Sequence, residues 1–240
     1  MSKLDGQTVV VIGGSAGMGL ETARLARAEG ADVVITGRNP DRLKQAAAEV
    51  GAVGSAAFDA ADPVRLREFF DGLSGGMDHV FVTAGGPYYG LLADLDLDEA
   101  ARHVGSALTL PLHLGRAAIG TVRGSLTFIG GTGARRPGPG LIVTSAMTNA
   151  QPSLIAGLAI EIAPIRVNLI AAGFVDTPLS ARLLGDDLEK RRRQLRDTLP
   201  IGRVVGPEDV AALAVHLMTN TALTGATYDI DGGQQFVPRG

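Results

Sequence analysis

Cysteine and tryptophan are absent from this sequence of 240 residues, and only 4% of the residues are aromatic. Without cysteine there is no disulfide, no thiolate nucleophile and no cysteine-bound metal, and we expect no metal site. The net charge of −3 gives no basic surface for nucleic acid or an anionic membrane. Neither a signal-peptide pattern nor an apolar run of the ~20 residues that span a bilayer is present. We therefore expect a soluble, cytoplasmic protein with no nucleic-acid or membrane partner.

Apolar residues are plentiful instead, at 45% of the chain, and 33 residues are glycine. Short Val- and Ile-rich runs alternate with helical patterns, as in a parallel sheet that helices bury on both faces. We predict the α/β class, with a Rossmann-like doubly wound sheet of about seven parallel strands in a single domain over residues 1–240. The runs cover residues 8–14, 32–38, 54–60, 79–85, 124–131, 166–173 and 226–233.

Helix starts are marked by capping residues. Asn39-Pro40 and Asp62-Pro63 each place an N-cap before a proline at the first helical position. Asp96 with Glu99 has the spacing of a capping box. These signals predict helices between the successive strands.

Residues 174–206 interrupt the alternation with a long, polar, helix-prone segment. Insertions of this kind after a strand often cover a binding site, so we expect a lid here. The segment contains Arg191-Arg192-Arg193, a run that could bind an anion. We favour the alternative interpretation, in which the three arginines form one solvated helix face.

A glycine-rich loop follows the first predicted strand and opens the first predicted helix. Gly13, Gly17 and Gly19 permit a tight turn and let backbone N–H groups approach a pyrophosphate at the helix N-terminus. The second strand ends at Arg38, where a preference for NAD usually requires an acidic residue. Because an arginine can pair with a 2′-phosphate, we predict that NADP(H) is preferred over NAD(H).

With these motifs the chain resembles the short-chain dehydrogenase/reductase family over essentially its whole length. Residues 83–86 resemble the family's Asn-Asn-Ala-Gly, with Val82 and Thr83 at the asparagine positions. Residues 171–178 resemble the segment that holds the nicotinamide, and 230–233 the C-terminal Asp-Gly-Gly. The resemblance implies cofactor contacts from Gly13, Ser15, Ala16, Gly17, Met18, Gly19, Arg38, Asp59, Ala60, Ala84, Gly85, Gly86, Gly173, Val175 and Thr177.

The family's catalytic Asn, Ser and Tyr-x-x-x-Lys pattern does not match. The tyrosine position falls on Thr144 and the lysine position on Thr148, while the serine and asparagine positions fall on Gly131 and Gly105. No catalytic role carries over, and the catalytic residues stay unknown. Pocket candidates are Tyr88, Tyr89, Thr132, Thr144 and Thr148, and the small side chains predict a wide, apolar pocket for a bulky or cationic unsaturated substrate.

Three interpretations stay open. Either another residue supplies the proton, or the substrate needs little acid, as an imine, iminium or conjugated alkene would, or the protein does not turn over. We favour an NADP(H)-dependent oxidoreductase with a non-standard active site, with a non-catalytic NADP(H)-binding sensor or scaffold subunit as the alternative. The resemblance also implies a homotetramer or dimer, formed through the helices near 97–118 and 142–163.

Overall fold

The computed structural model describes residues 2–73 and 75–237 and shows a seven-stranded parallel sheet. The strand order is β3-β2-β1-β4-β5-β6-β7, so the chain reverses its direction of winding between β1 and β4. This confirms the predicted doubly wound α/β fold. The strands are β1 (Thr8–Ile12), β2 (Asp32–Gly37), β3 (Gly54–Ala57), β4 (Met77–Val82), β5 (Val122–Gly131), β6 (Arg166–Ala172) and β7 (Thr227–Ile230).

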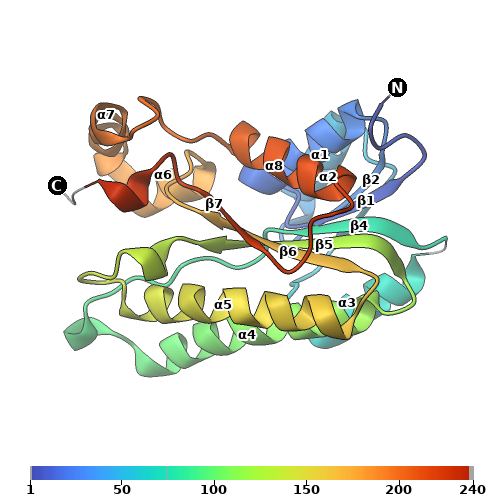
Figure 1. Cartoon of the computed structure of the whole chain (residues 1–240), viewed down its shortest axis with the longest axis horizontal. Helices are drawn as coiled ribbons and strands as arrows, with labels where there is room; N and C mark the ends of the chain where they lie inside the picture. Colours follow the sequence, from blue (N-terminus) through green and yellow to red (C-terminus); the bar gives the residue numbers. More distant parts are fainter. Residues whose placement is uncertain (1, 74, 238–240) are drawn as a thin grey trace.

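Helices cover both faces of this sheet (Figure 1). One layer contains α1, α2 and α8, the other contains α3, α4 and α5, and α6 with α7 lies at one end of the molecule. Short 3₁₀ turns complete the order within the described residues: η1 (Leu92–Asp94), η2 (Gly133–Arg135), η3 (Gly185–Asp187) and η4 (Gln234–Phe236). The helices are α1 (Gly17–Ala28), α2 (Pro40–Val50), α3 (Pro63–Gly72), α4 (Leu97–Ala118), α5 (Ile142–Glu161), α6 (Pro178–Leu184), α7 (Leu188–Thr198) and α8 (Pro207–Thr219).

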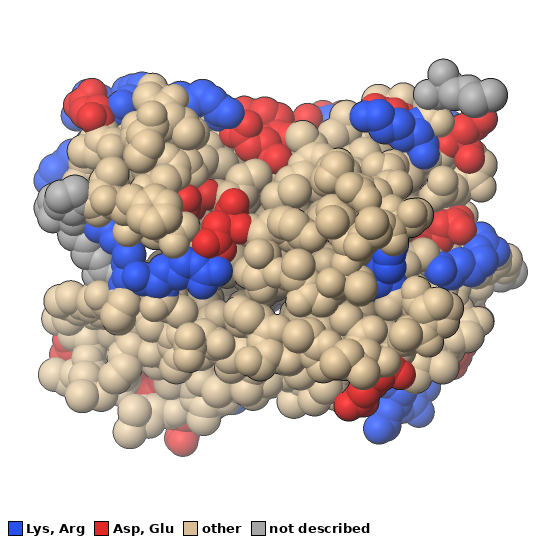
Figure 2. Space-filling view, in the orientation of Figure 1, with Lys and Arg blue, Asp and Glu red and all other residues tan. Residues whose placement is uncertain are grey.

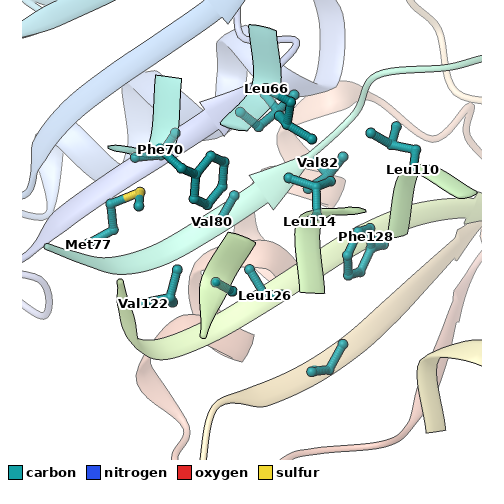
Figure 3. Packing of buried hydrophobic residues seen from close by; sticks show 14 of the residues in the cluster. Leu66, Phe70, Met77, Val80, Val82, Leu110, Leu114, Val122, Leu126 and Phe128 are labelled. Carbon is teal, nitrogen blue, oxygen red and sulfur yellow. The ribbon is translucent and has the colours of Figure 1, made fainter. Parts of the chain in front are cut away.

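Each face of the sheet has its own apolar core, because successive side chains of a strand point to opposite sides. In β4, Val80 and Val82 pack with α3 and α4 on one face, while Phe81 packs in the cluster of the other. Figure 3 shows the first cluster, where Phe70 of α3 and Leu114 of α4 approach the strands. The central strands are therefore buried on both faces, as the continuous apolar runs predict, whereas the edge strands β3 and β7 are only partly buried.

The predicted helix starts are confirmed. The side chain of Asn39 accepts a hydrogen bond from Arg42 N at 2.8 Å, and that of Asp62 accepts from Val64 N at 2.9 Å. Asp96 accepts from Glu99 N at 2.9 Å. Each side chain therefore satisfies an N–H group that the first helical turn leaves without a partner.

The segment predicted as a lid consists mainly of α6, η3 and α7. Its two ends meet in an isolated parallel bridge between Val175 and Val205, and Asp176 N donates to Val205 O at 3.0 Å. The segment therefore leaves the sheet after β6 and returns to nearly the same place before α8 begins. Over the described part of the chain, no helix combines the length and apolarity needed to cross a bilayer.

Candidate cofactor and substrate site

The glycine loop is a tight turn against the end of β2. Gly13 and Gly17 have φ of 94° and 54°, in the left-handed region that favours glycine. The N–H groups of Gly13 and Gly14 donate to Thr36 O at 3.2 and 2.9 Å. A Cβ on Gly19 would lie 2.4 Å from the carbonyl oxygen of Gly13, so a larger residue there would force the loop apart.

The first turn of α1 has no side-chain cap. Its N-cap, Ala16, supplies no side-chain hydrogen bond, and the first turn contains no acidic residue. The N–H groups of this turn therefore keep their capacity to bind an anion, which the helix dipole also favours. Ser15 is buried beside the turn, and a Cβ on Gly37 would lie 2.9 Å from its Oγ.

Thr83 fastens the loop to the end of β4, a role that sequence analysis does not assign. Its Oγ1 donates to Gly13 O at 3.1 Å, and its N–H group donates to Ile12 O at 2.8 Å. Of the residues that follow, Ala84 is half-buried, whereas Gly85 and Gly86 are exposed. A hydroxyl directly after the fourth strand, opposite a glycine loop, is the signal that could have identified this contact.

The residues expected to select the cofactor lie at the ends of the neighbouring strands β2 and β3, whose register pairs Gly37 with Ala57. Arg38 follows β2, is exposed, and pairs with no carboxylate among residues 2–73 and 75–237. Asp59 is exposed and accepts from Ala61 N at 3.0 Å, while Ala60 is buried. The guanidinium of Arg38 therefore has its charge available to an anionic ligand.

The segment after β6 returns to the glycine loop. A Cβ on Gly17 would lie 3.4 Å from Thr177 Cβ, so Thr177 borders the N-terminus of α1. Thr177 also caps α6 by accepting from Ser180 N at 3.3 Å. Val175 is buried, and a Cβ on Gly173 would lie 2.6 Å from Asp231 Cβ. The fold thus brings the two predicted cofactor segments together.

The threonines on α5 are buried and form hydrogen bonds with main-chain groups. Thr144 Oγ1 donates to Tyr88 O at 2.8 Å and accepts from Tyr88 N at 3.1 Å. Thr148 Oγ1 donates to Thr144 O at 2.9 Å and accepts from Ala134 N at 2.9 Å. Because each hydroxyl has one proton, both protons are already committed to carbonyl groups.

The turn after β5 packs directly on these threonines. A Cβ on Gly131 would lie 3.3 Å from Thr148 Cγ2, and one on Gly133 would lie 3.3 Å from Thr144 Cγ2. Ser145 Oγ donates to Gly133 O at 3.0 Å and adds a further link. Thr132 lies at the start of this turn, half-buried, with its N–H group donating to Ala172 O at 3.0 Å.

Tyr88 directs its phenol toward the N-terminus of α4. The hydroxyl lies 3.2 Å from Asp96 O and 3.4 Å from Glu99 Oε2, and the ring stacks on His103 with centroids 4.7 Å apart. Burial and the nearby Glu99 carboxylate raise the pKa of Tyr88. Tyr89 is 51% exposed. The two tyrosines therefore differ: Tyr88 is held by α4, whereas Tyr89 is open to solvent.

The arginine run on α7 is not one solvated face, and that interpretation was wrong. Arg192 pairs with Asp176 at 2.7 Å and with Glu189, and Arg191 lies over the ring of Phe174 at 6.0 Å from its centroid. Arg193 alone of the three is exposed. The side chains of Arg191 and Arg192 are half-buried because Phe174 offers an aromatic face and Asp176 a carboxylate.

A separate hollow of about 340 Å³ lies between α3 and the C-terminal half of α4. Leu66, Arg67, His113 and Arg116 are among its lining residues. It contains none of the residues predicted for the cofactor or the substrate, and the arrangement described above stays the candidate site.

Comparison with protein families shows which family the chain belongs to. A family model described as Enoyl-(Acyl carrier protein) reductase matches residues 13–235, which is most of the chain. The chain belongs to the short-chain dehydrogenase/reductase family. Among curated relatives, the short-chain dehydrogenase/reductase malC of Malbranchea aurantiaca is 28% identical, with 96% of this chain and 95% of the relative covered. An uncharacterised oxidoreductase of Mycobacterium tuberculosis, MT0954, is 31% identical, with 98% and 95% covered.

Solved structures of family members superpose closely on this one. The MalC reductase/Diels-Alderase from Malbranchea aurantiaca has a TM-score of 0.89 and 27% identity, with 98% of each chain covered. BdcA in complex with NADPH has a TM-score of 0.85 and 29% identity, with 96% of this chain and 95% of BdcA covered. The doubly wound fold of this family member is therefore shared along nearly its whole length.

Proposed function

We propose that this short-chain dehydrogenase/reductase is an NADP(H)-dependent reductase that works without a tyrosine acid. The observation that carries the proposal is the contrast between the proposed cofactor site at α1 and the catalytic region on α5. The first turn of α1 has no side-chain cap, whereas the hydroxyls of Thr144 and Thr148 are committed to main-chain groups. On the family pattern these threonines stand at the tyrosine and lysine positions. A reaction that needs no side-chain acid fits both features.

The described residues fit the cofactor. The first turn of α1 would bind the pyrophosphate, and Arg38 would bind the 2′-phosphate. Asp59 and Ala60 would contact the adenine ring. On the family resemblance Thr177 and Val175 would lie beside the nicotinamide, and the contact of Thr177 with Gly17 brings this segment to the glycine loop. The cofactor supplies hydride. BdcA, a similar structure, was solved with NADPH, which supports the assignment.

The substrate class follows from the missing acid. General-acid catalysis usually contributes roughly 10²–10⁴-fold, and a threonine cannot supply it. An iminium carbon accepts hydride without protonation, and a conjugated alkene yields an enolate that can take its proton from water. We therefore propose reduction of an iminium ion, of an imine that is protonated in solution, or of a conjugated alkene, and a bulky carbonyl group would take the proton for its alkoxide from water. The similarity to MalC, a reductase/Diels-Alderase, supports an unorthodox reaction within this fold.

One observation favours the alternative, a non-catalytic NADP(H)-binding sensor or scaffold. Thr144 links the 84–91 loop to α5 on both sides of Tyr88, and Gly90 N donates to Gly140 O at 3.0 Å. These hydrogen bonds hold the 84–91 loop against the start of α5, where a substrate would otherwise bind. In this second candidate function the cofactor would set the shape of the 84–91 loop and the lid for a partner.

Calorimetric titration with NADPH and NADH tests the cofactor half. We expect NADPH to bind at micromolar Kd or tighter, about −8 kcal/mol, and Arg38→Ala to reduce its advantage over NADH at least tenfold. Arg65→Ala, which removes an exposed arginine on α3, is the matched control and should change neither affinity. If neither nucleotide binds, both candidate functions are wrong.

Deuterium transfer tests the catalytic half. NADPH labelled at the transferable position is incubated with imines, iminium salts and conjugated enones, and products are analysed by mass spectrometry. Label in a reduced product establishes turnover. Tight NADPH binding without transfer to any member of the panel would favour the sensor.

A further inference from the structure

Four arginines lie at the end of the molecule where the β5–α5 connection meets the lid. Arg135 forms a bidentate pair with Asp229, with both N–O distances at 2.6 Å. Arg192 pairs with Asp176 and Glu189. These two guanidinium groups are neutralised by carboxylates. Their immediate neighbours in the sequence, Arg136 and Arg191, are not.

Arg136 and Arg191 have neutral partners. Arg136 Nη1 donates to the carbonyl oxygen of Gln234, and Arg191 Nη1 donates to Gln194 Oε1 at 2.8 Å. Within residues 2–73 and 75–237 neither forms an ion pair. Both side chains are half-buried and neither has a carboxylate partner, while the carboxylate of Asp231, in the turn that leads to Gln234, is buried and bonds to backbone N–H groups.

The two arginines belong to one cluster. Gln234, which accepts from Arg136 through its carbonyl group, also accepts from Phe174 N through Oε1 at 2.9 Å. The ring of Phe174 in turn lies beneath the guanidinium of Arg191. Burial and the charge of Arg136 lower the pKa of Arg191. Two like charges held partly out of water raise the free energy of the folded state, and a bound anion would lower it.

The cluster adjoins the candidate site. Phe174 directly follows Gly173 in the segment that borders the glycine loop, and Arg136 directly follows η2, the turn that packs on Thr144 and Thr148. Figure 2 shows basic and acidic side chains side by side between the α6–α7 end and the layer of α4 and α5. An anion held here would lie at the edge of the substrate region.

We propose that Arg136 and Arg191 bind a carboxylate or phosphate group of the substrate. This rests on the proposed function, and it specifies an imine or conjugated alkene that carries an anionic group at a distance from the reducible bond. A guanidinium suits either anion, because its planar N–H fork pairs with two oxygens at once. The cluster thereby favours an anionic substrate over one whose sole charge is a cationic iminium.

Calorimetric titration tests the site without knowledge of the substrate. Phenyl phosphate and benzoate are titrated into the NADPH-saturated protein, into the nucleotide-free protein, and into Arg136→Gln, Arg191→Gln and Arg193→Gln. We expect one of the two probes to bind and its affinity to fall at least tenfold in the first two variants. Arg193→Gln changes an exposed arginine on α7, the helix that contains Arg191, and its affinity for the probe should stay within twofold of the wild-type value. The preferred probe identifies the substrate's anion, and equal affinity in all variants would overturn the proposal.

Folding and alternative ligands are controlled within the same series. Arg136→Lys and Arg191→Lys keep the charge and should recover part of the affinity, whereas a merely structural role would leave it at the Gln level. NADPH affinity should stay within twofold in both Gln variants, and a tenfold loss would assign the arginines to the cofactor instead.

If no nucleotide binds but the probe still requires both arginines, the proposed function fails and the anion site stands. If NADPH binds and neither probe does, the anion site fails and the proposed function stands. The two proposals therefore have separate outcomes.

Discussion

At the scale of single residues, Thr144, which we propose to stand at the tyrosine position of the family pattern, has a structural role. Its hydroxyl bonds to both main-chain groups of Tyr88, and the side chain is 8% exposed. A hydroxyl that donates its only proton to a carbonyl group cannot also donate to a substrate oxygen. In this geometry Thr144 is a link between α5 and the 84–91 loop.

Thr144→Val tests this role because valine has the same shape and no hydroxyl. Leaving Tyr88 N and O without their partner should cost about 1–3 kcal/mol of unfolding free energy, measured by urea denaturation. Thr198→Val, at an exposed position whose hydroxyl bonds only within α7, should change stability by about 0.5 kcal/mol or less. Deuterium transfer should keep its wild-type rate per folded molecule. A stable Thr144→Val protein with lost transfer would instead make the hydroxyl catalytic.

Local residue patterns could predict part of this site but not its hydrogen bonds. The glycine loop depends on φ values and close approaches that only glycine permits, so its sequence predicts it. The direction of Arg191 and Arg192 depends on Phe174 and Asp176, which lie beside α7 only in the folded chain. A run of three arginines does not predict either of these two partners, and the solvated-face interpretation was wrong for this reason.

At the scale of elements, the strands were predictable because buried parallel strands are continuously apolar. The residues at which the strands end were not predictable. The run 54–60 predicts three residues more than β3 has, since the strand ends at Ala57. Asp59 accepts from Ala61 N in a local turn, which ends the pairing with β2. The helix starts were better defined, because an N-cap followed by proline specifies both a hydrogen bond and a φ angle.

The outer faces of α4 and α5 carry the next prediction. Leu97 and Ile142 near their N-termini are 70% and 55% exposed, and Leu112 and Ile160 further along are 49% and 80% exposed. Apolar faces of this extent on two long helices fit contact with another copy of the chain. We expect a homodimer or homotetramer by sedimentation velocity, and Leu112→Asp with Ile160→Asp should shift it toward monomer. Val64→Asp, on the exposed part of α3, is the control and should leave the assembly unchanged.

At the scale of the whole molecule, stability should depend on pH through one buried histidine at the opposite end of the sheet. His79 in β4 is 4% exposed, with Nε2 2.7 Å from Gln7 Oε1 and Nδ1 2.8 Å from Ser125 Oγ. The Gln7 carbonyl oxygen only accepts, so Nε2 carries the proton and Nδ1 accepts from the serine hydroxyl. The neutral ring therefore satisfies both partners.

Burial and, to a smaller degree, the charge of Arg166 lower the pKa of His79 from 6.5 to about 4, although the adjacent Asp78 opposes this. Between those two values the unfolded chain binds a proton that the folded protein does not, so stability falls as the pH falls from 6.5 toward 4. The full loss would be about 3 kcal/mol by linkage. Urea denaturation between pH 7 and pH 4.5 should show this slope in the wild type and in His113→Gln, which changes an exposed histidine on α4. His79→Gln should be less stable at pH 7 but should lose most of the slope, and an unchanged slope would assign the acid sensitivity to other groups.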